Sequence, residues 1–131
     1  MSQKNLIEIR DLAAASLPGS YEPLLLTFYG RNARQSGDAV IIGDDYGTEF
    51  HVRSDHSVFS VDPNRALPAR FVNSSILQLA RFIEIVSGTG TSDDASREMW
   101  SKLAVIDPLA FANEENWWAV VREQSRYESG R

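Results

Sequence analysis

The sequence of 131 residues contains no cysteine. Disulfide bonds, zinc sites built on thiolates and cysteine nucleophiles are therefore excluded. Long apolar runs are also missing, since stretches such as 24–26 and 40–42 are far shorter than the roughly 20 residues of a membrane-spanning helix. The first residues carry acidic side chains within their apolar portion, which a secretory signal does not. We therefore expect a cytoplasmic protein that does not bind membranes.

Positive charge is scarce as well, because 13 Lys and Arg residues against 18 Asp and Glu residues give a net charge of −5. Residues 38–62 contain six carboxylates and one arginine, Arg53, so this segment accounts for the whole excess of negative charge. An acidic surface repels nucleic-acid phosphates and attracts basic proteins. Nucleic-acid binding is therefore disfavoured. Two interpretations of the segment remain open, namely a set of solvated turns and a surface for a basic partner.

The remaining composition is that of a globular protein, with 43% hydrophobic and 24% charged residues. A chain of this length fits one domain, which we assign to residues 1–131. Residues 128–131 are expected to fray. Oligomerisation leaves no signal in the sequence, and we expect a monomer or a weak homodimer.

The first part of the chain predicts one helix followed by strands. Apolar residues three to four positions apart predict an amphipathic helix at 6–17, ended by Pro18. An apolar run predicts a strand at 24–29, whereas the polar residues 30–37 predict a loop. Short strands joined by tight turns then predict an antiparallel meander. These strands are expected at 39–42, 48–53 and 58–61, with a further extended piece before Asn73.

The last part of the chain predicts three helices, each preceded by a capping residue. Ser75 and Gln78 have the spacing of a capping box at the start of a largely buried helix. Together the patterns predict an α+β fold, in which a central antiparallel meander is packed against an N-terminal helix and C-terminal helices. The caps are Ser75, Ser92 or Asp93, and Asn113, for helices at 76–86, 93–106 and 114–127.

No residue set indicates catalysis, a cofactor or a metal ion. His51, Asp55 and His56 match no spacing of metal ligands, and we interpret them as polar strand and turn residues. The acidic residues at 44–47 are adjacent, whereas a calcium loop needs alternating oxygen ligands over twelve residues. Serines 74 and 75 lie outside a nucleophile elbow. We therefore expect no enzymatic activity.

Trp117 and Trp118 are adjacent, so on a helix their side chains point about 100° apart. We expect Trp117 to lie inside and Trp118 to lie at an edge or partly exposed. An exposed tryptophan commonly anchors a protein interface. The alternative for Trp118 is a second contact within the fold.

The order of these signals resembles the fourth branch of the SUKH superfamily of bacterial immunity proteins, over roughly residues 12–124. Asn73-Ser74-Ser75 opening a long helix is the most specific piece. Two positions depart from the family pattern, because Ser16 and the turn 55–57 stand where glycines are frequent. The other matching pieces are Leu17-Pro18, Ile41 to Gly47, the following two strands, Ile106-Asp107-Pro108 and Trp117-Trp118.

The resemblance implies a compact α+β fold without catalytic residues, and a cognate toxin as partner. Such proteins are encoded beside polymorphic toxin genes and neutralise the toxin by binding it. Many of these toxins are nucleases or deaminases with basic substrate clefts. Two alternatives remain, a regulatory or scaffold module of the same fold and a small enzyme. The residues we predict to bind the partner are Asp44, Asp45, Tyr46, Glu49 and Asp55, with Trp118 as a weaker candidate.

Overall fold

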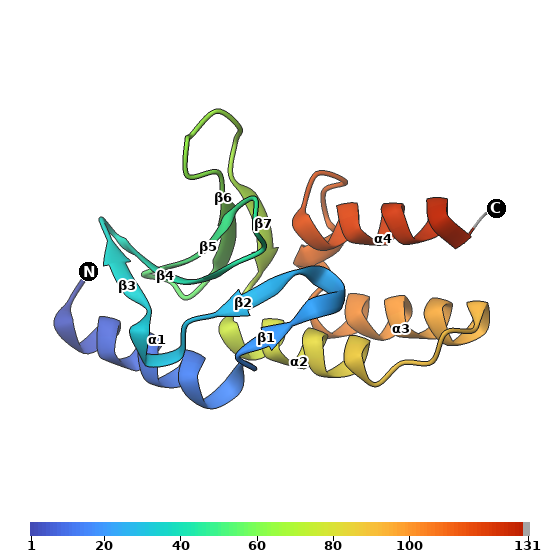
Figure 1. Ribbon diagram of the computed structural model, residues 1–131, viewed down its shortest axis with the longest axis horizontal. Coiled ribbons are helices and arrows are strands. Elements are labelled where there is room, and N and C mark those ends of the chain that lie inside the picture. The colour runs from blue at the N-terminus through green and yellow to red at the C-terminus, as the bar shows by residue number, and fades with distance from the viewer. Residues whose placement is uncertain (130–131) are drawn as a thin grey trace.

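Within residues 1–129, which the computed structural model describes, seven strands form one antiparallel sheet and helices lie beside and beyond it (Figure 1). This is the α+β architecture predicted from the sequence. The strand order is β1-β2-β4-β5-β6-β7, with β3 also paired to β4. The strands are β1 (Ser20–Tyr21), β2 (Leu26–Phe28), β3 (Arg34–Ser36), β4 (Ala39–Asp44), β5 (Glu49–Arg53), β6 (Val58–Val61) and β7 (Arg70–Asn73). The helices are α1 (Gln3–Ser16), α2 (Ile76–Ser87), α3 (Asp93–Ile106) and α4 (Trp117–Ser129), with the 3-10 turns η1 (Glu22–Leu24), η2 (Gly30–Asn32) and η3 (Pro108–Phe111).

The predicted meander is confirmed as β4, β5 and β6. Val52 of β5 is paired with Val40 on one side and Val58 on the other, and all three side chains are buried. The loop predicted at 30–37 is wrong in part, because η2 and β3 lie there. The side chains of β3 are all exposed, so no apolar alternation marks this strand. Its pairing with β4 decides its conformation.

Gly43 allows β2 to approach β4 at the end of the meander. The register of β4 and β5 shifts between Ile41 and Gly43, which marks a β-bulge. A Cβ atom at Gly43 would overlap the carbonyl oxygen of Thr27 and the ring of Phe28. Only glycine therefore fits here without displacing β2, just before the turn that joins β4 to β5.

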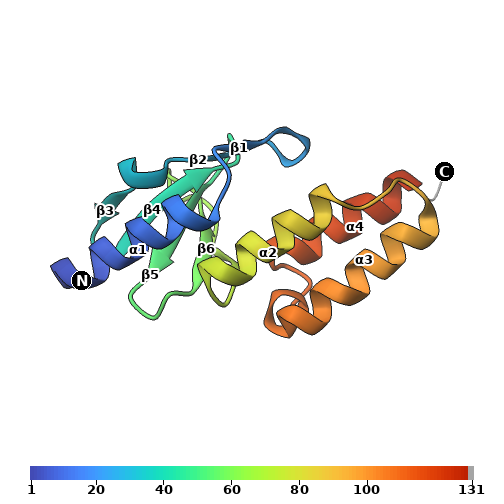
Figure 2. The same ribbon diagram turned by 90° about the horizontal axis from the view of Figure 1, so that it is seen from below.

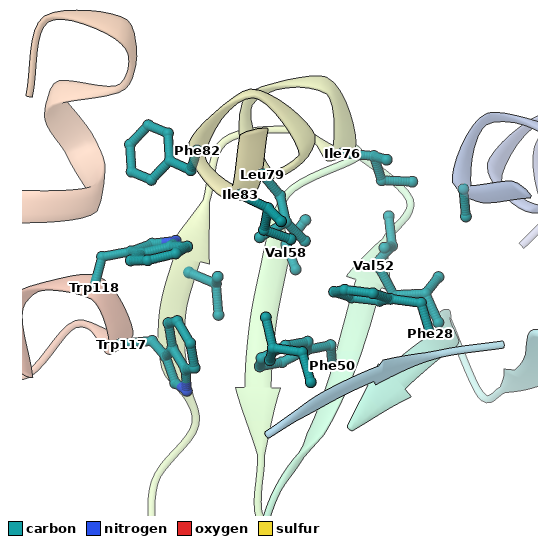
Figure 3. Close-up of a cluster of buried hydrophobic side chains, with 14 of the residues drawn as sticks. Phe28, Phe50, Val52, Val58, Ile76, Leu79, Phe82, Ile83, Trp117 and Trp118 are labelled. Atoms are coloured by element: carbon teal, nitrogen blue, oxygen red, sulfur yellow. The ribbon is translucent and has the colours of Figure 1, made fainter. Parts of the chain in front are cut away.

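The core lies between one face of the sheet and the helices. Helices α1 and α2 follow one another along this side, and α2, α3 and α4 extend beyond the sheet (Figure 2). In Figure 3, Leu79 and Ile83 of α2 face the sheet, and Phe50 lies beneath them. The ring of Phe50 also contacts Phe28, with ring centroids 6.1 Å apart. Among the described residues, no helix has both the length and the apolar character needed to cross a bilayer.

His51 lies on the opposite face of the sheet, as predicted from alternation, but it is only 8% exposed. Its interpretation as an exposed polar residue is therefore wrong. Ile41 and Phe59 are directly opposite it on the two neighbouring strands, so their side chains share this face of the sheet with His51. Its Nε2 lies 3.3 Å from the carboxylate of Glu49.

Serine caps begin α2 and α3, as predicted. Ser75 Oγ accepts a hydrogen bond from the backbone N–H of Gln78, at 3.2 Å. The side chain of Gln78 does not complete the capping box, because its Oε1 accepts from the Ser75 hydroxyl, at 2.9 Å, and not from the backbone N–H. Its Nε2 donates to the carbonyl of Ile106 and so joins α2 to the end of α3. Ser92, and not Asp93, caps α3 through the N–H of Ala95.

Helix α4 begins at Trp117, three residues later than predicted. Asn113 caps a turn instead, since its Oδ1 accepts from the N–H of Glu115 at 2.8 Å. The carbonyl of Asn116 accepts the first helical hydrogen bond, from Val120. Of the residues expected to fray, Glu128 and Ser129 belong to α4, whereas residues 130–131 lie outside the described residues.

Trp118 is fully buried, with 0% exposure, so the prediction that it is partly exposed is wrong. Helix α4 lies where the sheet meets α2 (Figure 3). One indole points toward the sheet and the other toward α2, so both contact protein. Trp117 packs edge-on against Phe50 at 5.4 Å, and Trp118 packs against Phe82 of α2 at 5.2 Å. Two neighbouring residues on one helix can therefore both be buried.

A buried hydrogen-bond network, formed by Asn73, Ser74, Asp107 and Trp118, joins β7, α3 and α4. Trp118 Nε1 donates to Asn73 Oδ1 at 2.8 Å, and Asn73 Nδ2 donates to Asp107 at 3.0 Å. The N–H and the hydroxyl of Ser74 also donate to Asp107, which is 1% exposed. The residues most specific to the family pattern thus connect the helices to the sheet.

Candidate partner-binding surface

The turn between β4 and β5 carries four of the residues predicted to bind a partner. We call Asp44, Asp45, Tyr46 and Glu49 the turn surface. Asp44 and Glu49 are directly paired at the ends of the two strands. The structure therefore brings these four residues together at one end of the sheet.

Asp45 fixes the shape of the turn. Its Oδ1 accepts hydrogen bonds from the N–H groups of Gly47 and Thr48, at 3.1 and 2.7 Å, and from the Thr48 hydroxyl at 3.0 Å. Its Oδ2 accepts from Trp117 Nε1 at 3.1 Å. The turn is thus attached to helix α4, far away in the sequence, and Asp45 has a structural role besides its charge.

Tyr46 projects from the turn with 83% of its side chain exposed. Its φ of 75° lies in the left-handed region, which is unfavourable for a bulky residue. The N–H of Tyr46 donates to Asp44 Oδ1 at 3.2 Å, which helps to hold this conformation. Residues kept in such strained conformations cluster at functional sites. An exposed aromatic residue held in this way is the most distinctive feature of the surface.

Asp44 lies beside Tyr29, whose hydroxyl donates a hydrogen bond to its Oδ2. Burial, the hydrogen bond to Asp44 and the negative charge of that carboxylate raise the pKa of Tyr29 to about 12. Tyr29 therefore remains a neutral donor at physiological pH. The charge of Asp44 is not cancelled by this contact.

The carboxylates of the turn surface differ in how their charge is balanced. Glu49 forms an ion pair with Arg34 at 3.1 Å. Asp44 and Asp45 take part in no ion pair among the described residues, and the groups that donate hydrogen bonds to them are neutral N–H and O–H groups. Their two negative charges are therefore available to a basic partner.

Asp55 lies apart from the other predicted residues. It belongs to the turn between β5 and β6, at the other end of β5, and a five-residue strand spans roughly 15 Å. Its Oδ1 accepts from the N–H of Ser57 at 3.0 Å and from the Ser57 hydroxyl, and these bonds lower the pKa of Asp55. The structure therefore does not bring Asp55 together with the turn surface, and a role of Asp55 in partner binding stays a prediction.

Trp118 also lies outside this surface, because no part of it reaches solvent. Its neighbour Trp117 is close to the turn through Asp45 and forms the floor of a depression beside it. The depression lies between η1 and α4, and both apolar and polar side chains line it. Its apolar residues include Leu24, Leu25, Val120 and Val121.

Leu25 is a surface residue that sequence reasoning missed. It is 55% exposed and has a φ of 59°. We predicted that it lies in a strand with Leu24 and Leu26. A signal was present, because successive strand residues point to opposite faces and three consecutive leucines cannot all enter one core.

These features describe a helix-covered antiparallel sheet with a rigid, acidic and aromatic turn at one end, an arrangement suited to binding another protein. Among the described residues, no group of three His, Asp or Glu side chains is placed to hold a metal ion. The model of the SUKH-4 immunity protein family matches residues 27–124, which include the turn surface and the buried network. The chain belongs to this family. No curated protein and no solved structure matches it.

Proposed function

We propose that this protein neutralises a cognate bacterial toxin in the cytoplasm by binding it through the turn surface, without catalysis of its own. Membership of the SUKH-4 immunity protein family supports the role. The observation that carries the choice of surface is Tyr46, because an exposed tyrosine in a strained backbone conformation offers a large contact area at little cost in conformational entropy.

The charges of the turn surface favour a basic partner. Asp44 and Asp45 carry negative charge without an ion-pair partner among the described residues. A nuclease or a deaminase that binds nucleic acid presents basic residues around its substrate cleft. We propose that the turn surface covers such a cleft and so prevents the toxin from binding its substrate.

The test uses the toxin domain encoded beside the gene of this protein. Co-expression with the immunity protein is expected to restore the growth of cells that produce the toxin, and the two purified proteins are expected to form a complex. An absence of both rescue and complex would contradict the proposal.

The role of the charge is tested with Asp44→Asn, which keeps an oxygen acceptor for the N–H of Tyr46. A unit charge acting at about 6 Å through water contributes about 0.7 kcal/mol, or roughly threefold in rate. Association is therefore expected to be roughly threefold slower at low salt, and the difference should vanish at high salt. The matched control is Glu98→Gln, on the exposed side of α3, which should leave association unchanged. Equal association rates for Asp44→Asn and the wild-type protein would argue against this surface.

A further inference from the structure

Two exposed apolar residues, Leu25 and Tyr46, share an uncommon backbone conformation. Their φ angles are 59° and 75°. Both side chains are more than half exposed. Glycine adopts this conformation without strain, whereas a large side chain there strains the backbone and, being more than half exposed, gains less from burial than a core residue does. A contact outside this chain would explain why large side chains occupy both positions.

The two residues lie at the same end of the sheet, just outside one strand ladder. Strands β2 and β4 pair Phe28 with Gly43 and Thr27 with Asp44. Leu25 precedes β2 and Tyr46 follows β4, beyond the last pair of this ladder. Two surface depressions meet there, because Thr48 lines both the one beside Leu25 and the one beside Tyr46.

The depression beside Leu25 has a fixed apolar floor. The indole of Trp117 is held from two sides, by edge-on packing against Phe50 at 5.4 Å and by its hydrogen bond to Asp45 at 3.1 Å. Val120 and Val121, one turn further along α4, are half-buried at its wall. The floor and walls therefore exist before any partner binds.

The charges around this depression are mixed, and negative charge lies on the side of Tyr46. Asp45 lines the depression and Asp44 precedes it in the turn, and neither has an ion-pair partner among the described residues. Arg70 lines the depression as well, and its guanidinium donates to the carbonyl of Glu115 at 2.6 Å. A partner is complementary when it presents an apolar side chain with a Lys or Arg next to it, toward Asp44.

We propose that Leu25 lines a socket that receives an apolar side chain of the toxin, and that Tyr46 lines the adjoining depression, where a basic residue of the toxin lies toward Asp44. This inference rests on the proposed function and adds the residue chemistry of the contact. The socket determines how long the complex lasts, whereas the carboxylates mainly determine how fast it forms. Leu25 and Tyr46 thus lower the stability of the free protein and increase that of the complex.

The test is the substitution of each residue by glycine, Leu25→Gly and Tyr46→Gly, with the toxin domain encoded beside the gene as the probe. Each variant is expected to raise the Tm, by roughly 3 °C, because the backbone strain is relieved. Each is also expected to weaken binding roughly tenfold or more, mainly through faster dissociation. Stability and affinity should therefore change in opposite directions.

Two control variants accompany these. His56→Gly changes a residue with a φ of 72° at the opposite end of the sheet, and Val105→Ala shortens an exposed apolar residue of α3. Both should bind the toxin domain as the wild-type protein does. Equal loss of binding in either control would contradict the assignment to this socket.

The outcomes separate the inference from the proposed function. If the wild-type protein does not bind the toxin domain, the proposed function fails and the inference fails with it. If the wild-type protein binds and both glycine variants bind equally well, the inference alone is wrong. A lower Tm in Leu25→Gly or Tyr46→Gly would show that the side chain supports the fold, and would also contradict the inference.

Discussion

The buried network around Asp107 and the turn surface around Asp45 are built from similar groups and have opposite surroundings. Each centres on an aspartate that accepts several hydrogen bonds from neutral donors. Each includes an indole N–H from the start of α4, supplied by Trp118 in the network and by Trp117 at the turn. One aspartate is enclosed by protein, and the other lies at the surface.

These different surroundings determine how much each set of hydrogen bonds contributes to the stability of the fold. Buried donors that lose their acceptor have no water to replace it, so the network around Asp107 is strongly tied to the stability of the fold. At the turn, water replaces a lost partner at lower cost. Substitutions in the turn should therefore cost the fold less stability than substitutions in the network.

The largest expected effect comes from Asp107→Ala. This change leaves the buried Asn73 amide and both donors of the half-buried Ser74 without their acceptor. We expect the free energy of unfolding to fall by about 3–4 kcal/mol, measured by urea denaturation. Asp94→Ala, an exposed change in the first turn of α3, should cost less than about 1 kcal/mol. Equal losses of unfolding free energy in the two variants would mean that the buried network contributes no more to stability than an exposed residue does.

A smaller effect is expected for the two tryptophans, which make the comparison within one helix. Trp118→Phe removes the donor to Asn73 inside the protein, and Trp117→Phe removes the donor to Asp45 at the turn. We expect losses of about 2 kcal/mol for Trp118→Phe and about 1 kcal/mol for Trp117→Phe in the same denaturation experiment. Both variants lose a similar volume, so each serves as the control of the other. The reverse order would mean that the turn supports the fold more than the network does.

The smallest effect concerns pH, and it is confined to the turn region. Burial and Asp44 raise the pKa of Tyr29 from 10.0 to about 12, so the folded protein favours its neutral form. The resulting stabilisation is complete below the unfolded pKa and is lost as the pH rises from about 10 toward about 12. Between about pH 9 and pH 11, the wild-type protein should lose more stability than Tyr29→Phe. An identical pH dependence in both would show that Tyr29 does not contribute.

Much of the fold follows from the sequence, because local signals and tertiary packing agree there. Alternating apolar residues predict β5, and serine caps predict the starts of α2 and α3. The exposed strand β3 could not be predicted, since only its pairing with β4 makes it a strand. The later start of α4 was also missed, because Asn113 is a good cap for either a helix or a turn.

The candidate surface was predicted in part. The acidic and aromatic residues at 44–49 were found, because glycine and aspartate mark a turn between two strands. Asp55 was grouped with them by its charge, although successive turns of the predicted meander necessarily lie at opposite ends of the sheet. Leu25 was missed because the three leucines together predict one apolar strand, although alternation implies that one of them points outward. Its left-handed backbone conformation, in contrast, is not predicted by any local residue pattern.

The adjacent indoles of α4 have one further consequence. Trp117 binds the turn to helix α4, and Trp118 binds the same helix to the core. The tip of the hairpin therefore moves little relative to the rest of the protein. If the turn binds the partner as proposed, binding requires little loss of conformational entropy, and the complex can be tight without a large contact area. Two neighbouring residues thus make the proposed binding surface as rigid as the interior of the protein.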